Sequence, residues 1–129
     1  MLDTKKLIVK MLNALKVDYV VEQGKSGMWT YRKWNSGIAE CWGTLSTSIA
    51  ITTQSPAYGG YRSGSVSTSN FPFTFSSTPN ATATANTTMG YWVNNISPAT
   101  TKLQFYLSAG TSMTAANRPV AFYVTGTWK

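Results

Sequence analysis

The sequence predicts an all-β protein: an antiparallel β-sandwich, a jelly-roll-like knob, preceded by one short N-terminal α-helix. Helical periodicity is confined to the first 16 residues, and period-two alternation with frequent turn residues runs through the remainder. With 129 residues, the chain is long enough for one hydrophobic core without disulfides or a metal. We therefore expect a helical segment over residues 1–17 and a β-sandwich domain over residues 18–129.

The helix is predicted from its cap and its apolar stripe. Asp3 or Thr4 can cap the N-terminus, and apolar side chains then recur at helical spacing. The stripe consists of Ile8, Met11, Leu12 and Leu15. Isolated helices shorter than about 12–15 residues are marginal in water, so the stripe needs a partner. Two partners are open: the sheet of the same domain, or copies of the same helix.

Strands are predicted wherever β-favouring residues alternate between turn signals. They are expected over residues 18–23, 28–34, 38–45, 48–53, 61–67, 73–77, 80–85, 91–96, 102–108 and 120–128. The alternation is clearest in Leu103, Phe105 and Leu107, which share one face. All five prolines fall at the edges of these segments or between them, where a missing N–H does no harm.

The charge of the chain is positive and unevenly placed. The formal net charge is +7, from eleven lysines and arginines against four carboxylates, and no Asp or Glu follows Glu40. Such a charge favours polyanionic partners, but the cations that follow Glu40 are far apart in the sequence and do not form a continuous phosphate-binding surface. Aromatics interleaved with Arg32 and Lys33 leave a single-strand nucleic-acid-binding β domain as an alternative. Aromatic pairs in a sandwich core explain the same residues better, so we expect no nucleic-acid partner.

The residue types needed for common catalysis are missing. The chain has no histidine and a single cysteine, Cys41, so neither a Ser-His nor a Cys-His nucleophile can be assembled. Within the expected sheet the carboxylates are Glu22 and Glu40, and nothing pairs them as in a glycosidase. We expect a non-enzyme with no cofactor and no metal. No apolar run approaches the ~18 residues of a membrane span, so no membrane insertion is expected.

Binding a saccharide without catalysis needs fewer specialised residues than an active site does. Exposed aromatic faces, amides and cations on a rigid scaffold are sufficient. Two stretches in the middle of the chain supply them. "AYGGYR" contains Tyr58, Tyr61 and Arg62, and "GYWVNN" contains Tyr91, Trp92, Asn94 and Asn95. From these, Tyr58, Tyr61, Arg62, Trp92 and Asn94 are the candidate saccharide-binding residues.

Four segments in order carry a resemblance to a known family. They are "YVVEQGKSGMWTYRKWNSGIAECWG", "NFPFTF", "YWVNN" and "AFYVTGTWK", and together they extend over residues 19–129. This pattern resembles the C-terminal receptor-binding or knob domain of tail-fibre and minor structural proteins from phages and prophages of Gram-positive hosts. The resemblance implies a β-sandwich knob, usually trimeric, that ends a fibre and recognises saccharides of the cell envelope.

The resemblance also gives the helix and the tryptophan-rich segment a role. It implies that Trp29, Trp34, Trp42 and Cys41 are scaffold, and that the helix is the end of a stalk whose stripe forms the trimer contacts. The expected function is host adhesion by a homotrimer in the virion tail, made in the bacterial cytoplasm. Its partner would be a host cell-wall saccharide or an anionic wall polymer. A purely structural virion or baseplate trimerisation module is the alternative. The family supplies no binding motif for these positions.

Overall fold

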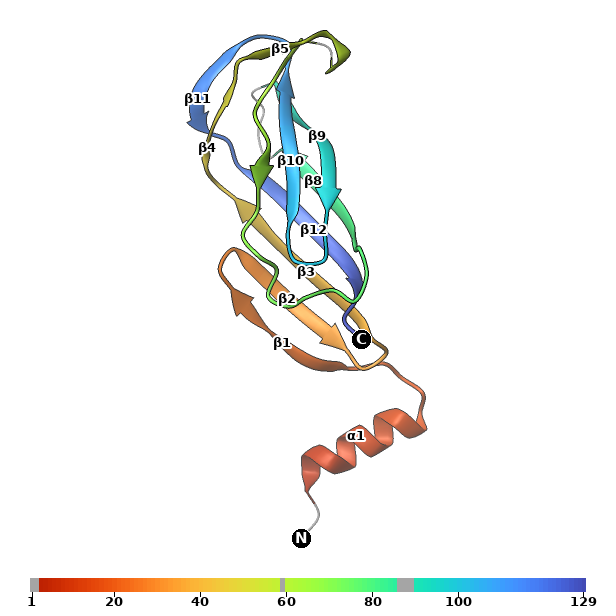
Figure 1. The fold of residues 1–129 in the computed structure, drawn as a ribbon. Helices are drawn as coiled ribbons and strands as arrows, with labels where there is room; N and C mark the ends of the chain where they lie inside the picture. The colour runs from red at the N-terminus through yellow and green to blue at the C-terminus, as the bar shows by residue number, and fades with distance from the viewer. Residues whose placement is uncertain (1–2, 59, 86–89) are drawn as a thin grey trace.

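The computed structural model describes residues 3–58, 60–85 and 90–129, and these contain one α-helix followed by two packed antiparallel sheets and a small two-stranded ribbon (Figure 1). The helix, α1 (Thr4–Ala14), begins after Asp3, whose side chain accepts a hydrogen bond from the Lys5 backbone N–H. The predicted β-sandwich with one short N-terminal helix is confirmed.

The first sheet has five strands, in the order β1-β2-β3-β12-β8. They are β1 (Val20–Ser26), β2 (Trp29–Trp34), β3 (Ile38–Leu45), β12 (Val120–Thr127) and β8 (Asn80–Ala85). The C-terminal strand β12 lies between β3 and β8 and pairs with β3 along its whole length. The β2–β3 hairpin turns at Gly37, whose φ of 101° is left-handed and favours glycine.

The second sheet is built around β10 (Leu103–Ala109). On one side β10 pairs with β9 (Tyr91–Pro98), and on the other with β6 (Gly60–Arg62) and then β7 (Val66–Ser67). Beyond β6 lies β5 (Thr53–Ser55), joined to it through a short 3₁₀ helix, η1 (Pro56–Tyr58). A separate two-stranded ribbon, β4 (Ser48–Ile51) with β11 (Met113–Asn117), lies at the end of the sandwich far from α1 (Figure 1).

Several strand predictions need correction. The expected strand over residues 73–77 is wrong, because Phe71, Phe73 and Phe75 instead form a cluster of edge-to-face rings at the end of the core. The backbone N–H groups of Phe71 and Phe75 donate to the loop at residues 100–101, so they are not available to a ladder. The expected strands 48–53 and 61–67 are each split in two. Strand β11 was not expected, since "MTAAN" has little apolar alternation.

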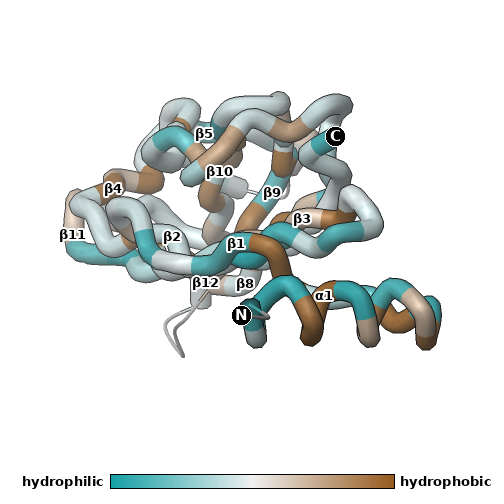
Figure 2. Tube along the Cα trace, turned by 90° about the horizontal axis from the view of Figure 1, so that it is seen from below, coloured by the Kyte–Doolittle hydropathy of each residue, from teal (hydrophilic) through white to brown (hydrophobic). Residues whose placement is uncertain are grey.

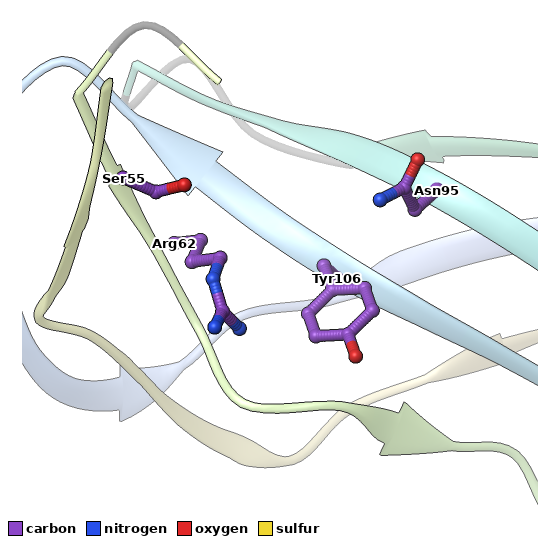
Figure 3. Close-up of a pocket in the computed structure, with 4 residues that line it drawn as sticks. All are labelled: Ser55, Arg62, Asn95 and Tyr106. Carbon is purple, nitrogen blue, oxygen red and sulfur yellow. The ribbon is translucent and has the colours of Figure 1, made fainter. Parts of the chain in front are cut away.

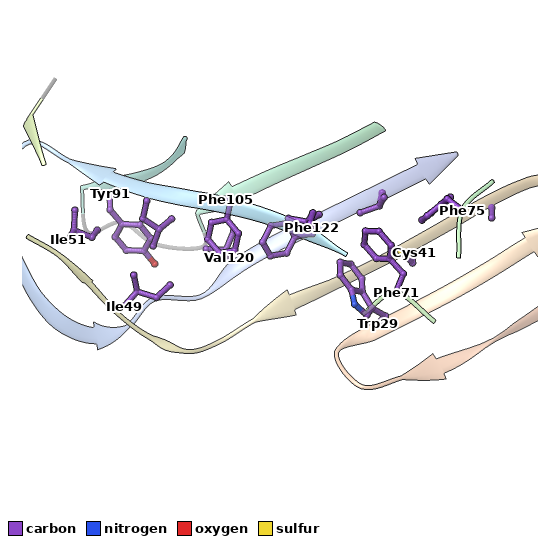
Figure 4. Packing of buried hydrophobic residues seen from close by; sticks show 14 of the residues in the cluster. Trp29, Cys41, Ile49, Ile51, Phe71, Phe75, Tyr91, Phe105, Val120 and Phe122 are labelled. Atoms are coloured by element: carbon purple, nitrogen blue, oxygen red, sulfur yellow. The ribbon is translucent and has the colours of Figure 1, made fainter. Parts of the chain in front are cut away.

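The core fills the space between the two sheets (Figure 4). The inward residues of β10, Leu103, Phe105 and Leu107, are fully buried, as their alternation predicts. Trp29 and Cys41 are also buried, and the Trp29 indole N–H donates to the Ser69 carbonyl at 3.2 Å. Trp34 and Trp42, the other two tryptophans of this tryptophan-rich segment, are half-buried and lie outside the core.

The helix stands apart from this core. None of its residues is buried, and Ile8 and Met11 are 51 and 56 % exposed; Leu15, the residue that caps its C-terminus, is 68 % exposed. Within the part of the chain described here, no helix is long and apolar enough to cross a bilayer. After the helix, Asp18 joins the chain to the β2–β3 hairpin, since its carboxylate accepts hydrogen bonds from the backbone N–H and the hydroxyl of Ser36. The apolar stripe of α1 is therefore left without a partner in a single subunit.

Candidate ligand-binding site on the second sheet

The outer face of the second sheet carries a row of polar and aromatic side chains. Because Leu103, Phe105 and Leu107 face the core, Tyr106 and Ser108 belong to the opposite face of β10. The register places Ser108 between Arg62 of β6 and Trp92 of β9. Although it is outward, Ser108 is fully buried, whereas Trp92 is 43 % exposed.

Arg62 and Tyr106 form the centre of the site. The guanidinium carbon of Arg62 lies 5.4 Å from the centroid of the Tyr106 ring, within cation–π distance. One Arg62 nitrogen donates to the carbonyl of Ser63 at 3.3 Å. Among the described residues, the side-chain ion pairs are those of Arg32 with Glu40 and Lys33 with Glu22, so Arg62 has no carboxylate partner there.

A bulge in β9 brings an amide to the same place. The β9–β10 register shifts between Gln104 and Tyr106, and Asn95, on the facing part of β9, has a left-handed φ of 50°. Asparagine tolerates this conformation better than most residues do, and bulges redirect side chains next to binding sites. The neighbouring Asn94 instead donates from its amide nitrogen to the Ser108 hydroxyl at 3.3 Å.

At this place a small, half-open cavity of about 280 Å³ is lined by Ser55, Arg62, Asn95 and Tyr106. Figure 3 shows the Ser55 hydroxyl and the Asn95 amide on opposite sides of the Arg62 and Tyr106 side chains. The lining offers a cation, an amide, two hydroxyls and an aromatic ring. Its volume of about 280 Å³ is just below the usual range of small-molecule sites, about 300–1,000 Å³. The cavity suits a group of monosaccharide size that carries several hydrogen-bonding atoms.

The structure brings together three of the five residues selected from the sequence. Arg62 lines the cavity, Trp92 is beside it on the same face, and Asn94 supports it through Ser108. Tyr61 packs against the hydrophobic core, and the side chain of Tyr58 lies outside the described part of the chain.

Sequence reasoning named Asn95 among the binding-type amides without choosing it, and it did not select Ser55 or Tyr106. A signal for Tyr106 was present, because it is the outward aromatic in the clearest alternating strand. For Asn95 the signal was weaker: two adjacent asparagines near a strand end are typical of an irregular backbone position. Nothing in the local sequence around Ser55 points to the cavity.

Two observations on the described residues concern metal binding and thiol reactivity in particular. No cluster of three or more His, Cys, Asp or Glu side chains in the described ranges could hold a metal ion. Burial raises the pKa of the Cys41 thiol to about 12, so this thiol remains protonated and unreactive at neutral pH.

The chain is thus an antiparallel β-sandwich with a polar and aromatic cavity, a candidate binding site, on the outer face of its second sheet. No family model and no curated protein matches the chain. Solved structures of the R1-type pyocin tail fibre share its fold. The N-truncated fibre aligns with 92 % of this chain and 94 % of its own, at a TM-score of 0.53 and 14 % identity.

A C-terminal fragment of the P. aeruginosa R1 pyocin fibre gives the same TM-score and identity, and here the alignment covers 31 % of that chain. The present chain thus spans about a third of that fragment. At 14 % identity these similarities show a common fold, and they do not indicate which class of bacteria is the host.

Proposed function

We propose that this chain is the distal receptor-binding domain of a phage tail fibre, and that it adheres without catalysis to a saccharide on the host cell surface. The observation that carries the proposal is the cavity of Arg62, Tyr106, Asn95 and Ser55 beside the exposed Trp92. The fold shared with a tail fibre and the resemblance of the sequence to such domains support the setting in a virion tail.

The recognition follows from the chemistry of the side chains. A sugar ring stacks on the exposed face of Trp92, while its hydroxyls exchange hydrogen bonds with Asn95 and Ser55. Arg62 then supplies donors to a ring oxygen, a hydroxyl or an acidic substituent. The net charge of +7 raises the rate of encounter with an anionic wall polymer at low ionic strength.

In this proposal the domain acts as a homotrimer. Three copies of α1 would bury the stripe of Ile8, Met11, Leu12 and Leu15 around a threefold axis. Several weak saccharide sites carried on one fibre end increase avidity without any new contact. The host would be Gram-positive, as the resemblance of the sequence implies.

Binding to cell walls tests this function. The purified full chain is incubated with Gram-positive cell walls, with and without chemical removal of teichoic acid, and the bound fraction is measured by co-sedimentation. Arg62→Met and Trp92→Ala are expected to weaken binding at least about tenfold, the loss of one or two contacts worth ~1.4 kcal/mol together. Lys102→Met removes an exposed cation at the β9–β10 turn and is expected to change binding less than twofold.

Two outcomes contradict the proposal. If folded Arg62→Met and Trp92→Ala proteins bind walls as the unaltered chain does, the cavity is not the receptor site. If the assembled chain binds no wall preparation at all, a structural virion module explains it better. Binding that falls steeply with salt and extends to single-stranded DNA supports the nucleic-acid alternative.

A further inference from the structure

The outer face of the first sheet has a groove of its own, about as large as the cavity of Arg62. Because Cys41 is buried in the core, its neighbour Trp42 belongs to the opposite, outer face of β3. The register pairs Trp42 with Thr30 of β2, and Thr30 with Lys25 of β1. An open groove of about 280 Å³ lies over these three strands, and we call it the first-sheet groove. Its lining includes Gln23, Lys25, Thr30, Arg32 and Trp42.

The groove presents positive charge to the solvent. Lys25 is exposed, and no carboxylate within the described ranges forms an ion pair with it. Arg32 Nε lies 2.9 Å from a carboxylate oxygen of Glu40, yet the Arg32 side chain is 42 % exposed and that of Glu40 only 13 %. The Tyr123 hydroxyl donates to the same carboxylate. Two exposed cations thus accompany one covered and engaged carboxylate, and this arrangement attracts an anionic group.

Aromatic and hydroxyl groups continue from the groove across the sheet. The Arg32 guanidinium carbon lies 5.0 Å from the ring centroid of Trp42, so the cation is held beside the ring. The register continues from Trp42 to Tyr123 of β12, which is 43 % exposed, and then to Thr82 of β8. Five neighbouring strands span about 19 Å at 4.7–4.9 Å per strand. The row from Lys25 to Thr82 is therefore longer than one sugar ring and can contact successive sugars of a glycan.

The first-sheet groove and the cavity of Arg62 lie on opposite sides of the sandwich. The view from below separates the layer of β1 and β12 from the layer of β5 and β10, which carries the cavity (Figure 2). The helix α1 lies beyond the end of the sandwich (Figure 1). Lys25 and Thr30 flank the β1–β2 turn, at the opposite end of β1 from the connection to α1. The groove and the cavity can therefore bind their ligands separately.

The placement of the charges indicates the kind of ligand. Lys25 and Arg32 lie at one end of the row, and the positions at its other end, Tyr123 and Thr82, are uncharged. A nucleic-acid strand carries a phosphate on every nucleotide, so it needs cations along its whole path. A glycan with an acidic sugar beside neutral ones needs cations at one place only. The row therefore suits such a glycan better than a nucleic acid.

We infer that the first-sheet groove binds a carboxylate-bearing sugar of a host-surface glycan, and that the adjoining sugars lie on Trp42 and Tyr123. The identification of the ligand as a saccharide rests on the proposed function, and the groove adds a second site to it. Lys25 and Arg32 contact the carboxylate through charge-assisted hydrogen bonds, and the Thr30 hydroxyl exchanges hydrogen bonds with sugar hydroxyls. The aromatic rings supply apolar contact to the faces of the sugars.

Calorimetric titration of the full chain at low ionic strength tests the groove. The probes are a hyaluronan hexasaccharide, in which glucuronate alternates with N-acetylglucosamine, and the neutral hexasaccharide of N-acetylglucosamine. All proteins carry Arg62→Met, so that the cavity does not contribute. Lys25→Glu is expected to weaken hyaluronan binding at least about tenfold, because repulsion replaces attraction. Lys102→Glu makes the same charge change at an exposed lysine between β9 and β10 and is expected to weaken it less than about twofold. Circular dichroism verifies that the variants are folded.

Chemical-shift mapping by NMR gives a second readout that does not depend on altering the groove. Addition of the hyaluronan hexasaccharide is expected to shift the signals of Lys25, Arg32, Tyr123 and the Trp42 indole N–H, and to leave that of the Trp92 indole N–H in place. The neutral hexasaccharide is expected to bind at least about tenfold more weakly, since it offers nothing to the two cations.

Three results overturn the inference. They are the absence of shifts at the groove, equal affinity of Lys25→Glu and Lys102→Glu for hyaluronan, and equal affinity of the groove for the two hexasaccharides. Tighter binding of a thymidine hexanucleotide at the same residues overturns the assignment to a saccharide. In each case, wall binding that depends on Arg62 and Trp92 leaves the proposed function intact. Conversely, hyaluronan binding at the groove together with wall binding that is indifferent to Arg62 and Trp92 supports the groove and contradicts the cavity.

Discussion

Arg118 holds the β4–β11 ribbon to the rest of the sandwich, and its substitution should show how much that attachment contributes to stability. It is only 6 % exposed. Its Nε donates to the Ile49 carbonyl at 2.8 Å and its Nη2 to the Thr114 carbonyl at 2.7 Å. The guanidinium carbon also lies 5.4 Å from the ring centroid of Tyr91, the first residue of β9. Tyr91 directly precedes Trp92, so this packing supports the start of the strand that carries the candidate site.

The magnitude follows from these three contacts. Hydrogen bonds from a charged donor contribute about 1.5–3 kcal/mol each, and a cation–π contact about 0.5–2 kcal/mol. The cost of burying the charge offsets part of their sum. Arg118→Lys keeps the charge but has no planar fork to reach both carbonyls, so we expect a loss of about 1.5–3 kcal/mol. Arg118→Met leaves both carbonyls without this donor, which costs about 1–3 kcal/mol for each, so we expect a loss of about 2–5 kcal/mol.

Urea unfolding followed by tryptophan fluorescence measures these losses, with Lys102→Met as a control at an exposed cation. The control is expected to stay within about 0.5 kcal/mol of the unaltered chain. Hydrogen exchange should then accelerate first in β4, β11 and the beginning of β9. The reasoning is refuted if Arg118→Met also unfolds within about 0.5 kcal/mol of the unaltered chain, or if the faster exchange lies elsewhere.

Three further predictions concern single positions. Because burial raises the pKa of Cys41 to about 12, its thiol in the folded chain at pH 8 should react with a disulfide reagent at least about 100-fold more slowly than in urea; equal rates would contradict this burial. Hydrogen bonding, first from the Ser36 hydroxyl, lowers the pKa of Asp18 below 3.8, so its stabilising effect is present above about pH 4 and is lost as the pH falls through the lowered pKa. Melting temperatures between about pH 2 and 5 should therefore depend less on pH in Asp18→Asn, and identical profiles would exclude this role. A Cβ on Gly43 would lie 2.0 Å from a neighbouring backbone carbonyl oxygen, so Gly43→Ala should cost about 1–3 kcal/mol or more in urea unfolding, whereas Gly64→Ala, with nothing within 4 Å, should cost less.

The sequence determined the features that depend on local backbone geometry. Period-two alternation identified the buried side of β10 before its partner strands were known, since successive side chains of any strand point to opposite faces. The Asp3 cap and the stripe of Ile8, Met11 and Leu15 likewise predicted the helix, because the cap bond and each step of the stripe join residues no more than four positions apart. The absence of histidine and the small number of carboxylates can also be read directly from the sequence, and they limit the types of catalysis that we expect.

Only the tertiary structure decided which outward residues meet. Arg62 and Tyr106 are far apart in sequence, and the antiparallel register of β6 with β10 brings them together. Asn95 enters the cavity through a bulge, a one-residue irregularity that no periodicity reveals. Phe75, expected in a strand, packs at the end of the core because other parts of the chain take its backbone hydrogen bonds. A strand's own pattern specifies its two faces, but register, bulges and loop packing depend on partners distant in sequence, and these partners create the candidate site.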